Sequence, residues 1–502
     1  MKRTAKHLAF LALSLTGLTA GAQTFTWGGA TPSLNEQGSP STHVLSSKFY
    51  RIYSRYNSDL FNQDVNVMSF SADKLTPGST TDLSVGQPAM GKAMLTHLKM
   101  FAVNGATQVI FLDEYNNKIK KRQLFTQTVD LETGKKTDPM LVTEMPDRSS
   151  DYKIMQSNNR QFYAVTKYHS FEKKLNEKIN IVLLDKDFKV VKETTFETPY
   201  INKNPQGQDF YVSDAGTVFI VKNIDLAKQK PFKTIFFWDG KSDTMKETSL
   251  KFDNDYQIHQ YNGLFNGPDF YFDALYTRIG TKAVQAYGGN KPAAGFYMAK
   301  FNAQGDNVYK TANDTDEIAG LTLKEFVINY DKTWLFADKM FVADKNKIID
   351  GKPSFEKDYT YHNEAFLFAR LDNGTGKLDW FKEVSNPEEK TLNDNGSFLS
   401  FLYFIKDDGL VVLYGDTQTV KFSKAEGKDR VVIYQTYDGT GKQTASRALS
   451  GNGLELKYND SYRSFEENFD LDTSVKPVKV DSNTYIIRAH SNGNEKYGYF
   501  KL

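Results

Sequence analysis

The residues best suited to metal binding or acid–base catalysis are scattered along the chain. The six histidines beyond residue 22 follow no H-E-x-x-H or other paired spacing; they are His43, His97, His169, His259, His362 and His490. A zinc site needs three or four ligands that converge. The sequence also has no G-x-S-x-G elbow and no phosphate-cradling loop. We therefore predict no metal centre and no cofactor, and we assign no catalytic residue.

Two acidic clusters have the residue types that bind calcium through carboxylate and carbonyl oxygens. One is KFDNDY, with Asp253 and Asp255, and the other is NFDLDTS, with Asp470 and Asp472. Neither has the full D-x-D-x-D-G-x5-E pattern of a calcium loop. Since Asp and Asn also stabilise tight turns through hydrogen bonds to the backbone, we interpret both clusters as solvated turns.

Aromatic residues make up 14% of the chain, and most of them must pack between sheets. A few could stack on sugar rings or contact a protein partner. Two long insertions, 276–294 and 338–362, depart from the regular strand pattern, and loops on a rigid scaffold often carry function. Four rings in these insertions are our predicted binding residues: Tyr276, Tyr287, Tyr359 and Tyr361. The alternative is that the rings pack the insertions onto the sheets.

The elements that must position these residues are short strands in a repeat. Apolar runs rich in Val, Ile, Phe and Tyr end at a turn, and this pattern occurs eight times. In the first seven copies the turns fall near residues 72, 130, 185, 239, 302, 372 and 438, which is a spacing of 54 to 70 residues. A second strand–turn–strand pair precedes most copies. Each repeat therefore predicts a four-stranded antiparallel meander.

A meander repeated at this length is typical of a β-propeller blade. Neighbouring blades cover both faces of each sheet, so the inner strands should be apolar without alternation. The runs VIFL, IVLL, IFFW and VVIY have this character. The alternative, an outer-membrane β-barrel, needs alternation over roughly 10 residues per strand, and the runs lack it. We predict an all-β protein, a β-propeller of four-stranded antiparallel blades.

The last repeat stops after its third strand, at Leu502. The segment TFTW at 24–27 is free to supply the fourth strand, and this pairing would cover an open sheet edge. We therefore expect residues 23–502 to form a single propeller domain of eight blades, closed by the N- and C-terminal strands. Seven blades are the alternative, if the first repeat, with its weak opening strand at 43–45, does not form a full blade.

The stretch LDNGTGKLDW at 371–380 carries a family resemblance. Asp372, the Thr-Gly-Lys at 375–377 and Trp380 resemble the quinoprotein-like (PQQ-type) propeller repeat, which joins the third and fourth strands of a blade. Asp should accept backbone N–H bonds in this turn, Gly376 should supply a positive φ, and the Trp ring should fill the space between blades.

Two further copies of this motif are partial. Asp130 has the same spacing to Thr-Gly-Lys, but Asp138 replaces the Trp, and Asp438 is one residue closer to its Thr-Gly-Lys. The resemblance implies a propeller and an architectural motif, and it transfers no cofactor.

The first 22 residues predict export. They contain three basic residues, which are Lys2, Arg3 and Lys6. An apolar run at 8–18 and a small-x-small site at 20–22 follow, as in a secretory signal peptide. This run is much shorter than the roughly 20 residues that span a bilayer. We expect cleavage before Gln23, a mature chain without a transmembrane segment, and a periplasmic or extracellular location.

The charge balance excludes one class of partner. The formal net charge is +2, and the predicted signal peptide carries three positive charges and no acid, which leaves −1 on the rest. Without a basic excess, nucleic-acid binding is not expected. We favour a binding or scaffolding propeller of the cell envelope with a protein or glycan partner. The alternative is a funnel-site enzyme, either glycan-cleaving or a quinone-dependent oxidoreductase, since carboxylates distant in sequence can converge in space.

Overall fold

The computed structural model describes most of the chain from Thr24 to Leu502. The segments outside the described residues are 1–23, 33–40, 45–47, 58–61, 84–94, 147–150, 169–173, 205–206, 228, 253–254, 284–290, 350–351, 393–397, 417–430, 450, 452–454, 456–468 and 492. The predicted signal peptide therefore lies outside the described residues. Every regular element in the described part is a β-strand. No helix in that part is long and apolar enough to cross a membrane.

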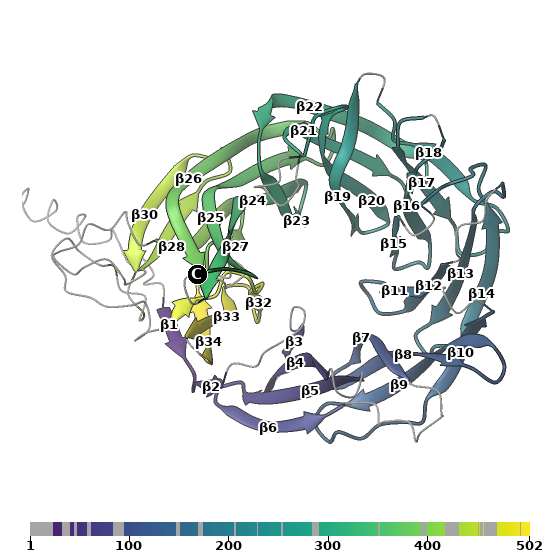
Figure 1. Cartoon of the computed structure of the whole chain (residues 1–502), viewed down its shortest axis with the longest axis horizontal. Helices are drawn as coiled ribbons and strands as arrows, with labels where there is room; N and C mark the ends of the chain where they lie inside the picture. Colours follow the sequence, from purple (N-terminus) through teal and green to yellow (C-terminus); the bar gives the residue numbers. More distant parts are fainter. Residues whose placement is uncertain are drawn as a thin grey trace, which may run out of the picture. The chain divides into compact units, whose positions relative to one another are not determined.

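The strands form eight antiparallel sheets, and in seven of them strands that are consecutive in the sequence are neighbours (Figure 1). The first sheet contains β3 (Ser41–Val44), β4 (Lys48–Asn57), β5 (Asn62–Ser71) and β6 (Pro77–Asp82). The second contains β7 (Thr96–Asn104), β8 (Thr107–Asn116), β9 (Lys121–Asp130) and β10 (Met140–Met145). The third contains β11 (Asp151–Gln156), β12 (Phe162–Tyr168), β13 (Lys178–Asp185) and β14 (Val190–Glu197). The fourth contains β15 (Gln208–Val212), β16 (Val218–Ile224), β17 (Phe232–Trp238) and β18 (Lys246–Ser249).

The remaining sheets continue the same order. The fifth contains β19 (Tyr256–Asn266), β20 (Asp269–Arg278), β21 (Ala293–Phe301) and β22 (Asn307–Ile318). The sixth contains β23 (Leu321–Asn329), β24 (Lys332–Ile349), β25 (Lys352–Asp372) and β26 (Leu378–Leu392). The seventh contains β27 (Phe401–Lys406), β28 (Gly409–Asp416), β29 (Val431–Tyr437) and β30 (Gln443–Leu449). The eighth contains β1 (Thr24–Trp27), β2 (Thr31–Pro32), β31 (Asp470–Leu471), β32 (Val478–Lys479), β33 (Thr484–Ser491) and β34 (Asn494–Lys501).

These sheets are the eight blades of a β-propeller, which confirms the predicted fold class. Seven have four strands, and the eighth has the four-strand order β1-β34-β33-β31, with the short strands β2 and β32 beside β34 and β33. The first repeat forms a full blade, because β3 pairs with β4. The alternative of seven blades is therefore wrong. The chain divides into two compact units, and each is described by itself. The smaller comprises Met1–Leu34, Phe70–Pro77 and Ser400–Leu502, and the larger comprises Asn35–Ser69 and Gly78–Leu399.

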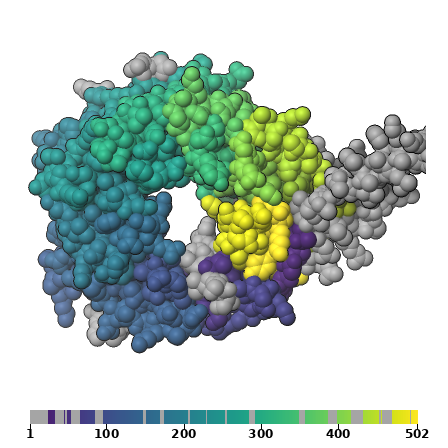
Figure 2. Space-filling view, turned by 180° about the vertical axis from the view of Figure 1, so that it is seen from behind, coloured from purple at the N-terminus to yellow at the C-terminus, as the bar shows by residue number. Residues whose placement is uncertain are grey.

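In the smaller unit, the N-terminal strand β1 lies beside the C-terminal strand β34 (Figures 1 and 2). Their antiparallel register runs from Thr24 opposite Lys501 to Trp27 opposite Gly498. Phe500 is fully buried in the core of this unit, and its ring stacks on Phe25 at 5.0 Å between centroids. The predicted pairing of residues 24–27 with the last strand is therefore present.

In the larger unit, the second and third strands of the sheets are more buried than the fourth strands. In β8 all side chains from Gln108 to Asp113 are buried, whereas the fourth strand β22 is mostly exposed or half-buried. The rings of Phe219 in β16 and Phe270 in β20 stack at 4.4 Å between centroids, so consecutive sheets pack face to face. The first strands β11 and β15 contact each other, as do β19 and β23. Figure 1 shows the first strands of these sheets on one side of the unit and the fourth strands on the other.

The predicted turn between the third and fourth strands is also present. Asp372 Oδ1 accepts hydrogen bonds from the backbone N–H (3.0 Å) and hydroxyl (2.8 Å) of Thr375, and Gly376 has a φ of 71°. The Trp380 ring packs edge-on against Trp334 of the same sheet. Aspartates accept backbone N–H bonds in the same way at Asp130, Asp185, Asp239 and Asp438. The resemblance to the quinoprotein-like repeat is thus one of architecture.

The prediction of a loop over residues 338–362 is wrong. Strands β24 and β25 form a long antiparallel hairpin over the described part of this segment, in which Phe341 lies opposite His362 and their rings stack at 4.2 Å. Lys347 and Glu356 form an ion pair of 3.0 Å across the two strands. Cross-strand pairs of opposite charge stabilise such a ribbon.

Candidate ligand-binding site

A cavity of about 600 Å³ opens on the first-strand side of the larger unit, and we call it the first-strand cavity. Four consecutive first strands, β7, β11, β15 and β19, provide its walls. Its lining residues are Leu98, Lys99, Tyr152, Lys153, Ile154, Met155, Asp209, Phe210, Tyr211, Tyr261 and Asn262. First strands suit this role because they form the edge of each sheet, so their side chains are not enclosed by a neighbouring strand on both sides.

Two half-buried tyrosine rings of this cavity are held by the sheets behind them. Tyr261 stacks on Phe272, with 5.3 Å between centroids, and Tyr211 packs at the same distance against Phe270. A third ring, that of Tyr152, is buried. The cavity therefore offers rigid aromatic faces that carry hydroxyl groups, a combination that suits ligands with both apolar and polar surfaces.

A carboxylate lies at the centre of the polar contacts. The Tyr261 hydroxyl donates a hydrogen bond of 2.5 Å to Asp209 Oδ2, and Lys153 Nζ lies 3.6 Å from Asp209 Oδ1. Lys153 Nζ also donates to the backbone carbonyl of Gln208 at 2.8 Å. Burial and the nearby Asp209 raise the pKa of the Tyr261 hydroxyl, so Tyr261 stays protonated and acts as a donor at neutral pH.

Two more lysines add positive charge to this region. The ammonium group of Lys99 carries a lowered pKa, because of burial and then the like charge of Lys153. The Lys233 ammonium lies 4.5 Å from the centroid of the Tyr261 ring, and burial lowers its pKa to about 8, against the opposing effect of Asp209. No carboxylate among the described residues forms an ion pair with Lys99 or Lys233. Lys99 and Lys153 among the lining residues, with Lys233 beside the Tyr261 ring, therefore outnumber the single carboxylate, that of Asp209.

A buried network holds the start of β15 in place behind the cavity. Lys222 Nζ forms an ion pair with Glu177 and donates to Gln208 Oε1 at 2.9 Å. Asn202 Nδ2 donates to Glu177 at 2.9 Å. Because Gln208 directly precedes Asp209, these contacts fix the position of the central carboxylate.

Of the four tyrosines predicted from the sequence, those that the structure describes lie elsewhere. Tyr276 belongs to β20 and is fully buried, with its hydroxyl 2.5 Å from Asp314 Oδ1, so its expected place in a loop is wrong. Tyr359 is exposed and Tyr361 is half-buried on β25 in the long hairpin. Tyr287 lies outside the described residues. None of the other three lines the first-strand cavity.

The residues of the first-strand cavity were not selected from the sequence, although a signal for them exists. Lys99, Asp209 and Tyr211 belong to the recurring strand–turn–strand pairs KMFAVNG and DFYVSDAG. The repeat marks these stretches as equivalent first strands. It does not reveal that side chains from four of them share one cavity.

The candidate metal ligands are separated or engaged elsewhere. Asp255 forms an ion pair with Lys230 at 3.0 Å, and Asp472 forms one with Arg488 at 2.5 Å. Asp470 begins β31, and Asp253 is not among the described residues. In the described part of the chain, no three His, Cys, Asp or Glu side chains are placed to hold a metal ion together.

Comparison with protein-family models gives no match, and comparison with curated proteins gives none either. Several solved structures are similar. The β-propeller domain of the Trilobed protease from Pyrococcus furiosus is 9% identical, with 88% of this chain and 98% of that chain covered and a TM-score of 0.37. A europium-containing methanol dehydrogenase is 9% identical, with coverages of 95% and 93% and a TM-score of 0.43. The polysaccharide lyase Uly1 is 10% identical, with coverages of 85% and 93% and a TM-score of 0.32. At these identities and scores we take no substrate, cofactor or mechanism from them.

Proposed function

We propose that the protein is an exported propeller of the cell envelope that binds an acidic glycan in the first-strand cavity without cleaving it. The location rests on the signal-peptide pattern of residues 1–22. The ligand class rests on the rings and charges of the cavity.

The rings favour a sugar. Tyr211 and Tyr261 give rigid faces on which a pyranose ring can stack, and the Tyr261 hydroxyl and Asp209 lie beside them to bond sugar hydroxyls. The volume of about 600 Å³ is within the usual range of small-molecule sites, roughly 300 to 1,000 Å³. Because the cavity crosses four strands, it can hold several sugar units of a longer chain.

The charges favour an acidic sugar, and this is the observation that carries the proposal. Lys99 and Lys153 line the cavity with Asp209 as the single carboxylate among its lining residues. Burial and the like charge of Lys153 disfavour the charged form of Lys99, as its lowered pKa indicates. A ligand carboxylate or sulfate beside Lys99 would compensate for this cost by forming a charge-assisted hydrogen bond.

The same arrangement favours binding over hydrolysis. Most glycoside hydrolases use two carboxyl groups about 5 to 9.5 Å apart. Asp209 has no second carboxylate beside it among the lining residues, and it is already bonded to Tyr261 and close to Lys153.

The long hairpin adds a second contact in this proposal. Tyr359 is 42% exposed on β25, with Tyr361 two residues further along the strand. Tyrosine rings suit a recognition surface, because they provide a large contact area at a small cost in conformational entropy. We propose that these two rings contact the envelope partner, a long glycan or a protein, outside the cavity.

Affinity electrophoresis of the purified mature protein tests the ligand class. Gels would contain polygalacturonate, a sulfated polysaccharide or neutral dextran. We expect retardation by at least one acidic polymer and none by dextran, with weaker retardation at high salt. Equal retardation by dextran would contradict the acidic class, and release of shorter products from the polymer would favour the enzyme class instead.

A further inference from the structure

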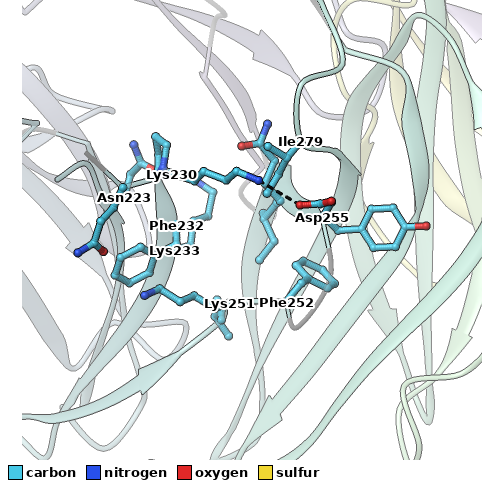
Figure 3. Close-up of a pocket in the computed structure, with 14 residues that line it drawn as sticks. Asn223, Lys230, Phe232, Lys233, Lys251, Phe252, Asp255 and Ile279 are labelled. Carbon is cyan, nitrogen blue, oxygen red and sulfur yellow. Dashed lines mark hydrogen bonds and ion pairs between the residues drawn. The ribbon is translucent and has the colours of Figure 1, made fainter. Parts of the chain in front are cut away.

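A second cavity of about 380 Å³ lies in the larger unit between the fourth and fifth sheets, and we call it the side cavity (Figure 3). Its walls come from strand ends and connections. Phe232 and Lys233 begin β17, Lys251 and Phe252 follow β18, and Ile258 lies near the start of β19. The side cavity shares no lining residue with the first-strand cavity.

Part of the side cavity is apolar and rigid. Phe252 packs against the buried Tyr276 and against Tyr297, with 5.1 Å between centroids in each case. Phe232 packs edge-on against Tyr200 at 5.8 Å. These rings, with Ile258, form a wall that suits an aromatic or branched aliphatic group.

The other part is positively charged. Lys251 Nζ lies 3.7 Å from the centroid of the Phe232 ring, and no carboxylate among the described residues forms an ion pair with it. Lys230 reaches across to Asp255, at 3.0 Å (Figure 3). Both side chains of this pair are largely exposed, at 63% and 85%, and exposed pairs contribute little to stability. Lys230 can therefore exchange Asp255 for a ligand anion at small cost.

We propose that the side cavity binds a small amphipathic anion, a carboxylate or sulfonate on an aromatic or branched aliphatic body. The body lies between Phe232, Phe252 and Ile258. The anionic group lies at Lys251, with Lys230 as its second cation. This site is separate from the glycan site in position and in ligand chemistry, and its existence does not depend on the proposed function.

The test uses two fluorescent probes that share an apolar body. 8-Anilinonaphthalene-1-sulfonate carries an anion, and N-phenyl-1-naphthylamine does not. We expect the sulfonate to bind saturably at one site and about tenfold more tightly than the neutral probe, which is the size of one charge-assisted hydrogen bond. Lys251→Gln should weaken sulfonate binding about tenfold and leave the neutral probe unchanged.

A second variant, expected to bind the sulfonate more tightly, excludes misfolding as the explanation for a change in affinity. Asp255→Asn removes the competing carboxylate from Lys230, so it should tighten sulfonate binding severalfold, which a damaged fold would not do. The control Lys186→Gln, on an exposed turn outside both cavities, should leave sulfonate binding unchanged. Equal affinity for the two probes, unchanged sulfonate binding in Lys251→Gln, or weaker sulfonate binding in Asp255→Asn would overturn the proposal.

Discussion

Charged residues occupy the buried second strands of several blades, and most of them have a partner. Asp113 bonds Arg122, Lys222 pairs with Glu177, and Arg488 pairs with Asp472. Asp273 in β20 differs, because neither of its carboxylate oxygens has a hydrogen-bond partner among the described residues. An isolated buried carboxylate is costly when ionised, so burial raises the pKa of Asp273 well above its usual range.

This raised pKa predicts how stability depends on pH. Above the unfolded pKa of an aspartate, about 3.9, the unfolded chain releases the proton while the folded chain still holds it. Asp273 therefore lowers the free energy of unfolding progressively as pH rises from that value to the folded pKa. Asp273→Asn, which cannot titrate, should be more stable than wild type at pH 8 by about 1 to 3 kcal/mol and nearly equal to it at pH 3.5.

Urea unfolding at the two pH values measures this difference. The exposed Asp187, paired with Lys186 on a turn, provides the control, and Asp187→Asn should show little change at either pH. A stability gain for Asp273→Asn that is the same at pH 3.5 and pH 8 would contradict an unpartnered, proton-holding carboxyl group.

At the scale of elements, we expect loss of the C-terminal strand to reduce stability most. β34 pairs with both β33 and β1, and Tyr497 and Phe500 are buried. Deletion of residues 497–502 removes these rings and leaves backbone groups of two strands unpaired. We expect the free energy of unfolding to fall by more than about 3 kcal/mol.

Thermal unfolding of the truncated protein gives the measurement. Lys501→Ala is the matched control, since Lys501 lies in the same strand with an exposed side chain, and it should leave the melting temperature nearly unchanged. If the truncated protein has the same melting temperature as the wild type, β34 is not needed to complete its sheet.

Shortening the long hairpin tests whether Tyr359 and Tyr361 contact the partner. Replacing residues 341–361 by a short Gly-Ser connection should leave folding intact, because the first residues of β24 and the last of β25 keep their pairing. In our proposal the hairpin contacts only a long partner. The shortened protein should therefore bind an acidic polymer more weakly but a short acidic oligosaccharide as tightly as wild type. Unchanged capture of the polymer would remove Tyr359 and Tyr361 from the contact surface.

At the scale of the whole molecule, the repeat predicted the eight sheets because each strand and turn is encoded locally. The pairing of β1 with β34 also followed from the sequence, since one missing strand and one spare strand were both visible. The hairpin was missed because residues 338–362 depart from the regular strand pattern of the repeat, although Asp350-Gly351 is a hairpin signal. Tyr276 was misplaced because a ring near the end of a strand looks the same in the sequence whether it is buried or exposed.

The candidate site is the part that sequence reasoning could not reach. Lys99, Lys153, Asp209 and Tyr261 are far apart in sequence and lie on four different strands. No local pattern distinguishes them from the other lysines, aspartates and tyrosines of a chain with this composition. Only the packing of consecutive sheets in the larger unit brings them around one cavity.

The central claim is that the excess cations of the first-strand cavity bind an acidic glycan, and calorimetric titration of Lys99→Gln tests it most directly. An oligosaccharide of the acidic polymer retained in the gel would be titrated into wild type, Lys99→Gln and the control Lys186→Gln. Lys99 has no ion pair among the described residues, so its loss should not affect folding. We predict that Lys99→Gln binds about tenfold more weakly, with a smaller dependence on salt, while Lys186→Gln binds as wild type does. Equal affinity of wild type and Lys99→Gln for the acidic oligosaccharide would contradict the proposal.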